Sequence, residues 1–376
     1  MPAVPITIPA SLLPDDGRFG CGPSKVRPEA VAALAAAAPT LLGTSHRQAG
    51  VRGQVGRLRQ GVSDLFALPD GWEVILGNGG TTAFWDAAVF GLIERRSLHL
   101  SFGEFSSKFA AAAAAAPFLD EPTVITSPTG THPRLPGADP AVDLYGLTHN
   151  ETSTGVAMAP ARPADANAQQ LVAVDATSAA GGLRWDPSQL DVYYFAPQKC
   201  LASDGGLFLA CCSPAAIERI ERLAASDRWI PASLDLKIAL DNSRQNQTNN
   251  TPALATVFLA VHQLEWLNAN GGLEWAASRC DRSATNLYNW AEGSSFATPY
   301  VVEPSERSHV VATIDFDPGV DASTVAATLR ANGIVDTESY RKLGRNQLRI
   351  ALFPAIEPDD VAALTACIDH VVASLA

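Results

Sequence analysis

Two ionisable residues stand where apolar segments typical of buried strands come to an end. Asp175 closes such a segment in "LVAVDAT", and Lys199 follows another in "VYYFAPQKCLASDGGLFLA". A lysine in this position either reaches outward to water or has an amine tuned for chemistry. Since ligands of doubly wound sheets gather at the carboxyl ends of the strands, we expect both side chains to face one crevice.

An aspartate and a lysine that share a crevice match the two protein groups that a pyridoxal phosphate site most needs. The carboxylate keeps the ring nitrogen of the cofactor protonated, while the amine forms a Schiff base and later moves a proton. On this pair alone a structural interpretation stays open, in which Asp175 caps a turn and Lys199 is unrelated to it. Other parts of such a site must therefore be sought in the sequence.

A glycine-rich turn supplies a candidate phosphate site. In "ILGNGGTTAFWDAA" a predicted strand leads through Gly77, Gly79 and Gly80 to Thr81 and Thr82, which begin a predicted helix. Glycines let the backbone close on an anion, and the N-terminus of a helix attracts it. The turn matches neither the GxGxxG fingerprint nor the phosphate loop of nucleotide-binding proteins, and taken singly it is also an ordinary connection.

Two further segments offer partners for a flat ring. "SFGEFSSKFA" places Phe102 and Phe105 after the next predicted strand, where an aromatic side chain can stack on the ring. "THNETSTG" places Asn150 and Thr152 after another strand, where they could hydrogen-bond to the ring oxygen or the phosphate. Each of these residues could equally belong to the core or satisfy nearby backbone groups.

The elements that must position these residues alternate over the first two thirds of the chain. Helical patterns cover residues 27–42, 51–68, 81–96 and 106–119, and strand-like runs cover 72–76, 97–102, 122–126, 143–150, 171–177, 191–196 and 206–210. This order predicts an α/β fold with a mostly parallel sheet flanked by helices.

After about residue 255 the pattern changes to α+β. A long helical region is followed by a strand in "SHVVATIDF", a helix, a strand in "QLRIALFP" and a last helix, with Asp321 and Asp359 as candidate caps of the last two helices. We therefore expect a large cofactor-binding domain over residues 16–260 and a small C-terminal domain over residues 261–376. Residues 1–15 are expected to pack on the small domain.

Composition limits the classes of function. The 376 residues are 47% hydrophobic and can bury a large core. The formal net charge of −12 disfavours sequence-independent binding of nucleic acid. Because no basic leader or long apolar tract is visible, we expect a cytoplasmic protein without membrane or nucleic-acid partners. Six cysteines with no CxxC pair indicate reduced thiols and no metal site.

Taken in order, nine segments resemble those of the phosphoserine aminotransferase family, which belongs to the class V group of fold-type I pyridoxal phosphate enzymes. The segments are "FGCGPSKVRPE", "TSHRQ", "GNGGTT", "GEFSSKF", "HNETSTG", "VDATSAAGG", "YYFAPQKCLASDGG", "QTNNTP" and "LRIALFP". They span nearly the whole chain, and the ordered set is much more specific than any one motif.

The resemblance implies pyridoxal 5'-phosphate as the cofactor, borne by Lys199 and paired through its pyridine nitrogen with Asp175. The other implied contacts are Phe105 stacked on the ring, Thr152 and Gln198 bonded to the ring or its substituents, Gly80 and Thr81 at the phosphate, and Asn250 and Thr251 at the phosphate held by the partner subunit. Family members are homodimers whose active sites lie at the interface, so the function of the last two residues would depend on assembly.

For the substrate, the resemblance implies that Arg349 in "LRIALFP" clamps the α-carboxylate with its planar guanidinium. His46 and Arg47 would bind the distal phosphate or γ-carboxylate. Each could otherwise be an ordinary surface or turn residue.

The chain also departs from many members of the family. Thr81 stands where they have an arginine in the glycine turn, and Phe105 stands where they have a tryptophan. A histidine that they use shortly before the carboxylate-binding arginine is absent from "SYRKLGRNQLR". Arg341 or Lys342 could supply the cation lost from the turn, and the choice among Arg341, Lys342 and Arg345 stays open.

The implied activity is amino transfer between L-glutamate and 3-phosphohydroxypyruvate, which gives O-phospho-L-serine and 2-oxoglutarate in serine biosynthesis. Some family members also act in pyridoxine biosynthesis. The alternatives are another class V enzyme, such as an alanine–glyoxylate aminotransferase or a cysteine desulfurase, and a non-catalytic regulator that binds pyridoxal phosphate. A regulator would normally carry a DNA-binding module, for which the chain has neither a basic pattern nor spare length.

Overall fold

The computed structural model of the protein describes residues 6–375. The helices are α1 (Pro28–Leu41), α2 (Ala49–Phe66), α3 (Thr81–Gly91), α4 (Ser106–Ala115), α5 (Pro214–Ala224), α6 (Leu236–Arg244), α7 (Leu254–Ala269), α8 (Gly272–Gly293), α9 (Ala322–Ala331) and α10 (Pro358–Leu375). The strands are β1 (Glu73–Asn78), β2 (Ser97–Ser101), β3 (Thr123–Thr126), β4 (Leu144–Thr148), β5 (Asn150–Glu151), β6 (Val156–Ala157), β7 (Leu171–Asp175), β8 (Val192–Phe195), β9 (Leu207–Cys212), β10 (Ala297–Pro299), β11 (Val311–Phe316) and β12 (Gln347–Ala351).

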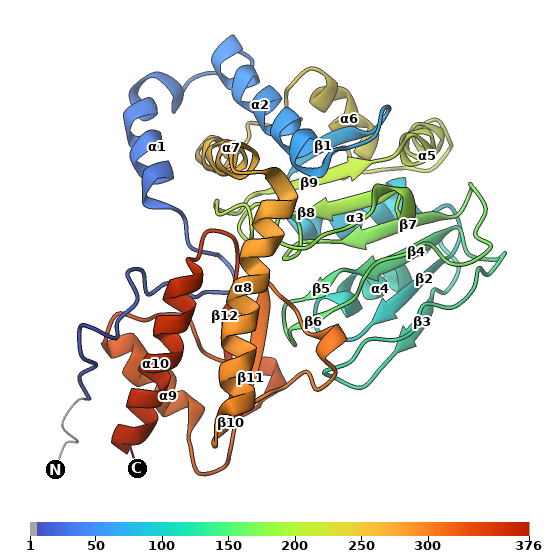
Figure 1. Cartoon of the computed structure of the whole chain (residues 1–376). Coiled ribbons are helices and arrows are strands. Elements are labelled where there is room, and N and C mark those ends of the chain that lie inside the picture. The colour runs from blue at the N-terminus through green and yellow to red at the C-terminus, as the bar shows by residue number, and fades with distance from the viewer. Residues whose placement is uncertain (1–5, 376) are drawn as a thin grey trace.

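A seven-stranded sheet in the order β1-β9-β8-β7-β4-β2-β3 forms the centre of the larger part of the molecule (Figure 1). The five strands β8, β7, β4, β2 and β3 are parallel to one another, whereas β9 is antiparallel to both β8 and β1. The prediction of an α/β fold with a mostly parallel sheet is therefore confirmed.

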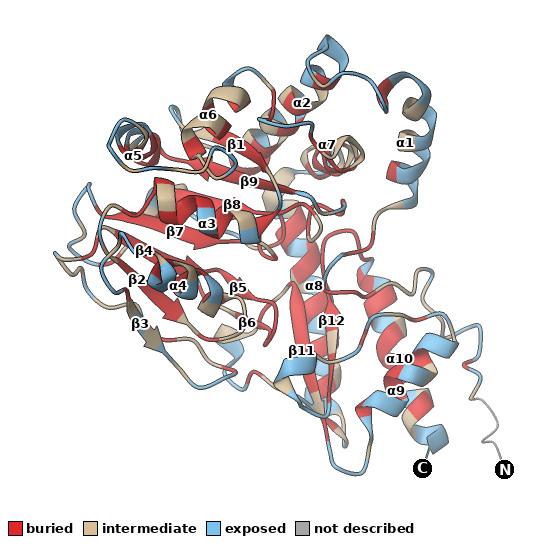
Figure 2. Cartoon of the chain, turned by 180° about the vertical axis from the view of Figure 1, so that it is seen from behind, coloured by how far each residue is buried: buried red, intermediate tan, exposed pale blue. Residues whose placement is uncertain are grey.

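Helices cover both faces of this sheet, so its central strands are buried throughout (Figure 2). Because successive side chains of a strand point to opposite faces, β8 contributes to two separate cores. Tyr193 and Phe195 pack with α2 and α7, and Val192 and Tyr194 pack with the helices α3 to α6. The carboxyl ends of the strands are therefore held in place by close packing on both faces of the sheet.

The C-terminal part is built around a three-stranded antiparallel sheet, β10-β11-β12; α8 and α9 pack against this sheet, and α10 packs against these two helices (Figure 1). Ile8 is buried in the same core, and its N–H donates to Asn332 Oδ1 at 3.0 Å. Residues 1–5 of the predicted N-terminal segment lie outside the described residues. The domain boundary that the sequence suggests near residue 260 falls within α7 and stays a prediction.

The structure tests the two helix caps that were predicted from the sequence. Asp321 accepts hydrogen bonds from the N–H groups of Ser323 and Thr324, as a cap of α9 should. The prediction that Asp359 caps α10 is wrong, because the helix already begins at Pro358 and Asp359 lies in its first turn. Its charge there still favours the helix dipole. Among residues 6–375, no helix has the length and apolar character needed to cross a membrane.

Candidate active site

A cavity of about 320 Å³ lies at the carboxyl ends of β7 and β8, where the sheet topology predicted a crevice. Its lining comprises Gly22, Gly79, Gly80, Thr81, Thr82, Trp85, Phe105, Asn150, Thr152, Asp175, Thr177, Gln198, Lys199 and Gly206. The structure therefore brings together seven of the residues proposed from the sequence as cofactor contacts, which are Gly80, Thr81, Phe105, Thr152, Asp175, Gln198 and Lys199.

Asp175 is held by three hydrogen bonds from neutral donors. Its Oδ1 accepts from the backbone N–H of Thr177 at 2.9 Å and from the Thr177 hydroxyl at 2.6 Å, and its Oδ2 accepts from the indole N–H of Trp85 at 3.1 Å. Burial raises the pKa of Asp175 to about 6, although these hydrogen bonds oppose the rise. The carboxylate is therefore mainly ionised at neutral pH, and it can hold a cationic ring nitrogen.

Lys199 lies beyond the end of β8, and its Nζ donates a hydrogen bond to the carbonyl oxygen of Cys21. Burial lowers the pKa of Lys199 to about 8, and the charge of Arg349 contributes to the decrease. Gly22 leaves room for the amine in this position, since a Cβ there would lie 1.8 Å from Nζ and 2.6 Å from Cε and would force the lysine side chain to shift. Gly22 belongs to the N-terminal segment "FGCGPSKVRPE", but its contact with the lysine was not predicted.

The glycine turn has the features that an anion site requires. Gly79 and Gly80 have φ angles of 117° and 86°, which favour glycine, and Gly80 as the N-cap residue of α3 has no side chain with which to cap the helix. The Thr81 hydroxyl lies 2.8 Å from that of Thr177. A phosphate at this helix end would meet backbone N–H groups and the positive end of the helix dipole.

Phe105 is positioned by a buried carboxylate that the sequence did not reveal as important. Glu151 is fully buried and accepts hydrogen bonds from the backbone N–H groups of Phe105 and Ser106 at 3.1 and 2.8 Å, and from the Ser153 hydroxyl at 2.7 Å. Gly103 leaves space for it, because a Cβ there would lie 2.3 Å from Glu151 Cγ. Its place in "HNETSTG", between two predicted site residues, was the only available signal.

The polar groups around the ring position fit a cofactor that carries hydrogen-bonding groups. Asn150 Nδ2 and the Thr152 hydroxyl both donate to the Ser178 hydroxyl, at 2.7 and 2.8 Å. Asn150 Oδ1 and Gln198 Oε1 are buried, and neither has a hydrogen-bond partner among residues 6–375. Such groups are costly to bury unless a ligand or water satisfies them. The residues present therefore fit pyridoxal phosphate.

Arg349 lies on β12 beside this cavity. Its Nη1 donates to the carbonyl oxygen of Thr152 at 3.2 Å, and its guanidinium lies 5.2 Å from the ring centre of Tyr340. Its Nε is buried and has no hydrogen-bond partner in the described part of the chain. A substrate carboxylate could satisfy this donor and keep the cation paired.

The other predicted substrate cations lie outside the cavity. Lys342 donates to Glu104 Oε1 at 2.5 Å, and Arg345 pairs with Asp315. Arg341 is exposed at the start of a short 3-10 helix. The choice among Arg341, Lys342 and Arg345 as a phosphate ligand therefore stays a prediction.

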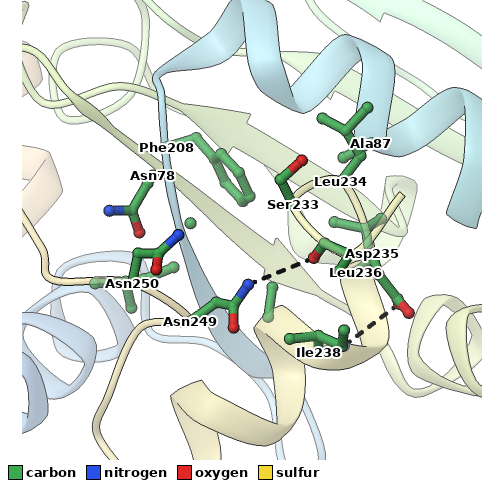
Figure 3. A pocket seen from close by; sticks show the side chains of 14 residues that line it. Asn78, Ala87, Phe208, Ser233, Leu234, Asp235, Leu236, Ile238, Asn249 and Asn250 are labelled. Carbon is green, nitrogen blue, oxygen red and sulfur yellow. Dashed lines mark hydrogen bonds between the residues drawn. The ribbon is translucent and has the colours of Figure 1, made fainter. Parts of the chain in front are cut away.

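The cavity of Lys199 is not lined by the other four predicted site residues, which are His46, Arg47, Asn250 and Thr251. The Thr251 hydroxyl lies 3.2 Å from His46 Nδ1, and Arg47 donates to Gln247, so both predicted segments form one unit. Asn250 lines a second, smaller pocket between β1 and the start of α6, together with Asn78 and Asn249 (Figure 3). The proposed contacts of these residues with the cofactor and substrate stay predictions.

The Lys199 amine, the Asp175 carboxylate and the N-terminus of α3 meet at one sheet edge, which is the arrangement that a pyridoxal phosphate-dependent enzyme requires. Residues 19–337 match the family described as "Aminotransferase class-V". The putative phosphoserine aminotransferase of Mycobacterium leprae is 61% identical over 98% of this chain and 98% of the relative. The phosphoserine aminotransferase of Rhodococcus jostii is 58% identical over the full length of both.

The fold is also shared with a solved structure. The crystal structure of a phosphoserine aminotransferase from Cytophaga hutchinsonii superposes with a TM-score of 0.87 at 22% identity, and it covers 94% of this chain and 99% of its own. The chain belongs to the class V aminotransferases and, within them, to the phosphoserine aminotransferase family. It is a pyridoxal phosphate-dependent transaminase.

Proposed function

We propose that the enzyme transfers an amino group between L-glutamate and 3-phosphohydroxypyruvate, giving O-phospho-L-serine and 2-oxoglutarate. The names of the relatives at 58 to 61% identity support this reaction. The observation that carries it is the partly buried guanidinium of Arg349 beside Thr152, whose buried Nε has no hydrogen-bond partner among residues 6–375, since both substrates bear an α-carboxylate. The reaction would serve serine biosynthesis in the cytoplasm, and pyridoxine biosynthesis if the related phosphorylated hydroxythreonine compound is also accepted.

Each residue has a defined part in this proposal. When bound, pyridoxal phosphate supplies an electron sink for the carbanion formed at the substrate Cα. Asp175 would pair with the ring nitrogen, and Arg349 would orient the substrate through its carboxylate. Lys199, displaced by the substrate amine, would remove the proton from Cα, because its lowered pKa leaves a useful fraction of neutral amine near neutral pH.

We further propose a homodimer in which each chain completes the site of the other. Asn250 and Thr251 would reach the partner's cofactor phosphate, and His46 and Arg47 the distal group of the substrate. The proposal is supported by the direct contact of these two segments with each other, which would let them cross an interface as one unit.

Absorbance spectra test the reaction. The purified enzyme should show the band of the lysine-bound cofactor, lose it on addition of L-glutamate, and recover it with 3-phosphohydroxypyruvate. Lys199→Ala should lack the band. Recovery with glyoxylate after bleaching by L-alanine, and none with the phosphorylated oxo acid, would instead identify an alanine–glyoxylate type of enzyme.

Subunit mixing tests the shared site. Lys199→Ala and the double variant Asn250→Ala/Thr251→Ala should each be inactive alone. In a mixed dimer one of the two sites is intact, so mixing equal amounts should restore about one quarter of the wild-type activity. No recovery from verified mixed dimers would show that each chain builds its own site.

Arg47 is tested separately with two amino-group acceptors. Arg47→Ala should weaken the use of 3-phosphohydroxypyruvate more than that of unphosphorylated hydroxypyruvate, because only the former presents a phosphate to the guanidinium. Equal losses for the two acceptors would remove Arg47 from the phosphate site.

A further inference from the structure

One face of α3 presents two side chains to the carboxylate that faces the cofactor ring. Thr81 and Trp85 are four residues apart, so they lie about one helical turn apart on the same side of the helix. The Thr81 hydroxyl contacts the Thr177 hydroxyl, which donates to Asp175 Oδ1, and the Trp85 indole N–H donates to Asp175 Oδ2 at 3.1 Å. The helix whose N-terminus faces the phosphate site thus also reaches the ring-nitrogen site.

We propose that Trp85 is a positioning residue for the cofactor, which acts by holding Oδ2 of Asp175 ionised and directed toward the ring nitrogen. This inference rests on the proposed pairing of Asp175 with that nitrogen.

The chemistry of the donors supports this role. An indole N–H can only donate, so Trp85 stabilises the carboxylate and cannot serve a protonated Asp175 as an acceptor. The side chain of Trp85 is 5% exposed, so its hydrogen bond acts where water competes little. Thr177 occupies the other oxygen, and together the two residues fix both the position and the charge of the carboxylate.

A purely structural role makes a different prediction. Trp85 also packs in the core formed by α3 to α6 and one face of the sheet. If packing were its whole contribution, its loss would weaken every ligand of the cavity alike. A role through Asp175 concerns only ligands that have a basic ring nitrogen.

Binding of two cofactors to the apoprotein separates these roles. One ligand is pyridoxal phosphate, and the other is its deaza analogue, in which CH replaces the ring nitrogen. Trp85→Phe should bind pyridoxal phosphate about tenfold more weakly, as expected for the loss of one hydrogen bond to a charged group. Its affinity for the analogue should be nearly unchanged. Trp72→Phe, at the residue just before β1, is the matched control and should change neither affinity.

The outcomes are distinguishable from failure of the underlying assignment. Equal losses for both ligands in Trp85→Phe would overturn the positioning role. If Asp175→Asn also weakens both ligands alike, the pairing of Asp175 with the ring nitrogen fails as well. If Asp175→Asn discriminates between the ligands and Trp85→Phe does not, only the role of Trp85 is refuted.

A second measurement uses the wild-type sequence at Trp85, so it does not depend on the folding of a Trp85 variant. In the wild-type apoprotein labelled with 15N-tryptophan, one indole N–H resonance should shift with the ionisation of Asp175, whose pKa burial raises to about 6. The same resonance should lose this pH dependence in Asp175→Asn, while the other indole resonances are unaffected. Absence of any indole resonance that titrates with Asp175 would contradict the proposal.

Discussion

The rate at which the apoprotein captures pyridoxal phosphate should depend on pH through the amine of Lys199. Its pKa of about 8 leaves about one amine in ten neutral at pH 7, against about one in three thousand for a lysine with an ordinary pKa of 10.5. Because only the neutral amine attacks an aldehyde, burial makes Lys199 about three hundredfold more available at this pH. The fraction of neutral amine rises as the pH increases through 8 and then levels off.

The assay compares initial rates of capture with those of Nα-acetyl-lysine in the same solutions between pH 6.5 and 10, which divides out the titration of the cofactor. The ratio of the two rates should stay constant below about pH 8 and then fall about tenfold per pH unit, since only the free lysine continues to gain neutral amine. Lys199→Ala should show no capture. A ratio that stays constant up to pH 10 would refute the argument, because Lys199 would then titrate as an ordinary lysine.

The charge of Arg349 gives this experiment an internal check. Arg349→Met removes a cation that lowers the pKa of Lys199, so the bend in the pH profile should move upward. Arg345→Met removes an arginine that is paired with Asp315 at the surface, and it should leave the bend in place.

Two further variants test the packing around the site. Gly22→Ala should slow capture at least about tenfold, because the new Cβ would occupy the place of the Lys199 amine, whereas Gly53→Ala on α2 has open space and should capture normally. Unaltered capture by folded Gly22→Ala would contradict this geometry. Glu151→Gln should lower the free energy of unfolding by about 2–4 kcal/mol, since an amide cannot accept from all the donors that converge there. Glu104 pairs with Lys342 near the surface, so Glu104→Gln should lower the free energy of unfolding by less than about 1 kcal/mol. Equal losses for the two variants in urea unfolding would contradict the special role of Glu151.

The parts of the site that could be predicted from sequence are those set by local signals at strand ends. Gly79, Gly80 and Thr81 form a turn whose chemistry is local, and Asp175 and Lys199 each close an apolar run. The rule that ligands bind at the carboxyl ends of parallel strands then brings these residues together, without knowledge of any side-chain contact. The strands themselves were predictable because burial on both faces requires continuous apolar runs.

Residues that act through contacts distant in sequence were not predictable in the same way. In the sequence, Trp85 is one apolar residue among others in a predicted helix. Its neighbours in the sequence give no sign that its indole N–H donates to a carboxylate 90 residues further along the chain. Glu151 is an ionisable residue that lies in the core, whereas glutamates are expected at the surface from their composition. The break between α7 and α8 at Gly271, with a φ of 117°, did have a signal in "NANGG".

The distribution of the site residues has a consequence for how the enzyme can be assembled. The residues that would hold the ring and the covalent bond come from one sheet edge, and they already converge in a single chain. His46 and Thr251 instead meet each other outside that cavity. In the proposed homodimer the partner subunit completes the phosphate site, so a monomer would bind the ring with that site incomplete. Cofactor affinity should then fall when the protein is diluted below the dissociation constant of the dimer, because dilution separates the subunits and removes the phosphate contacts that the partner supplies.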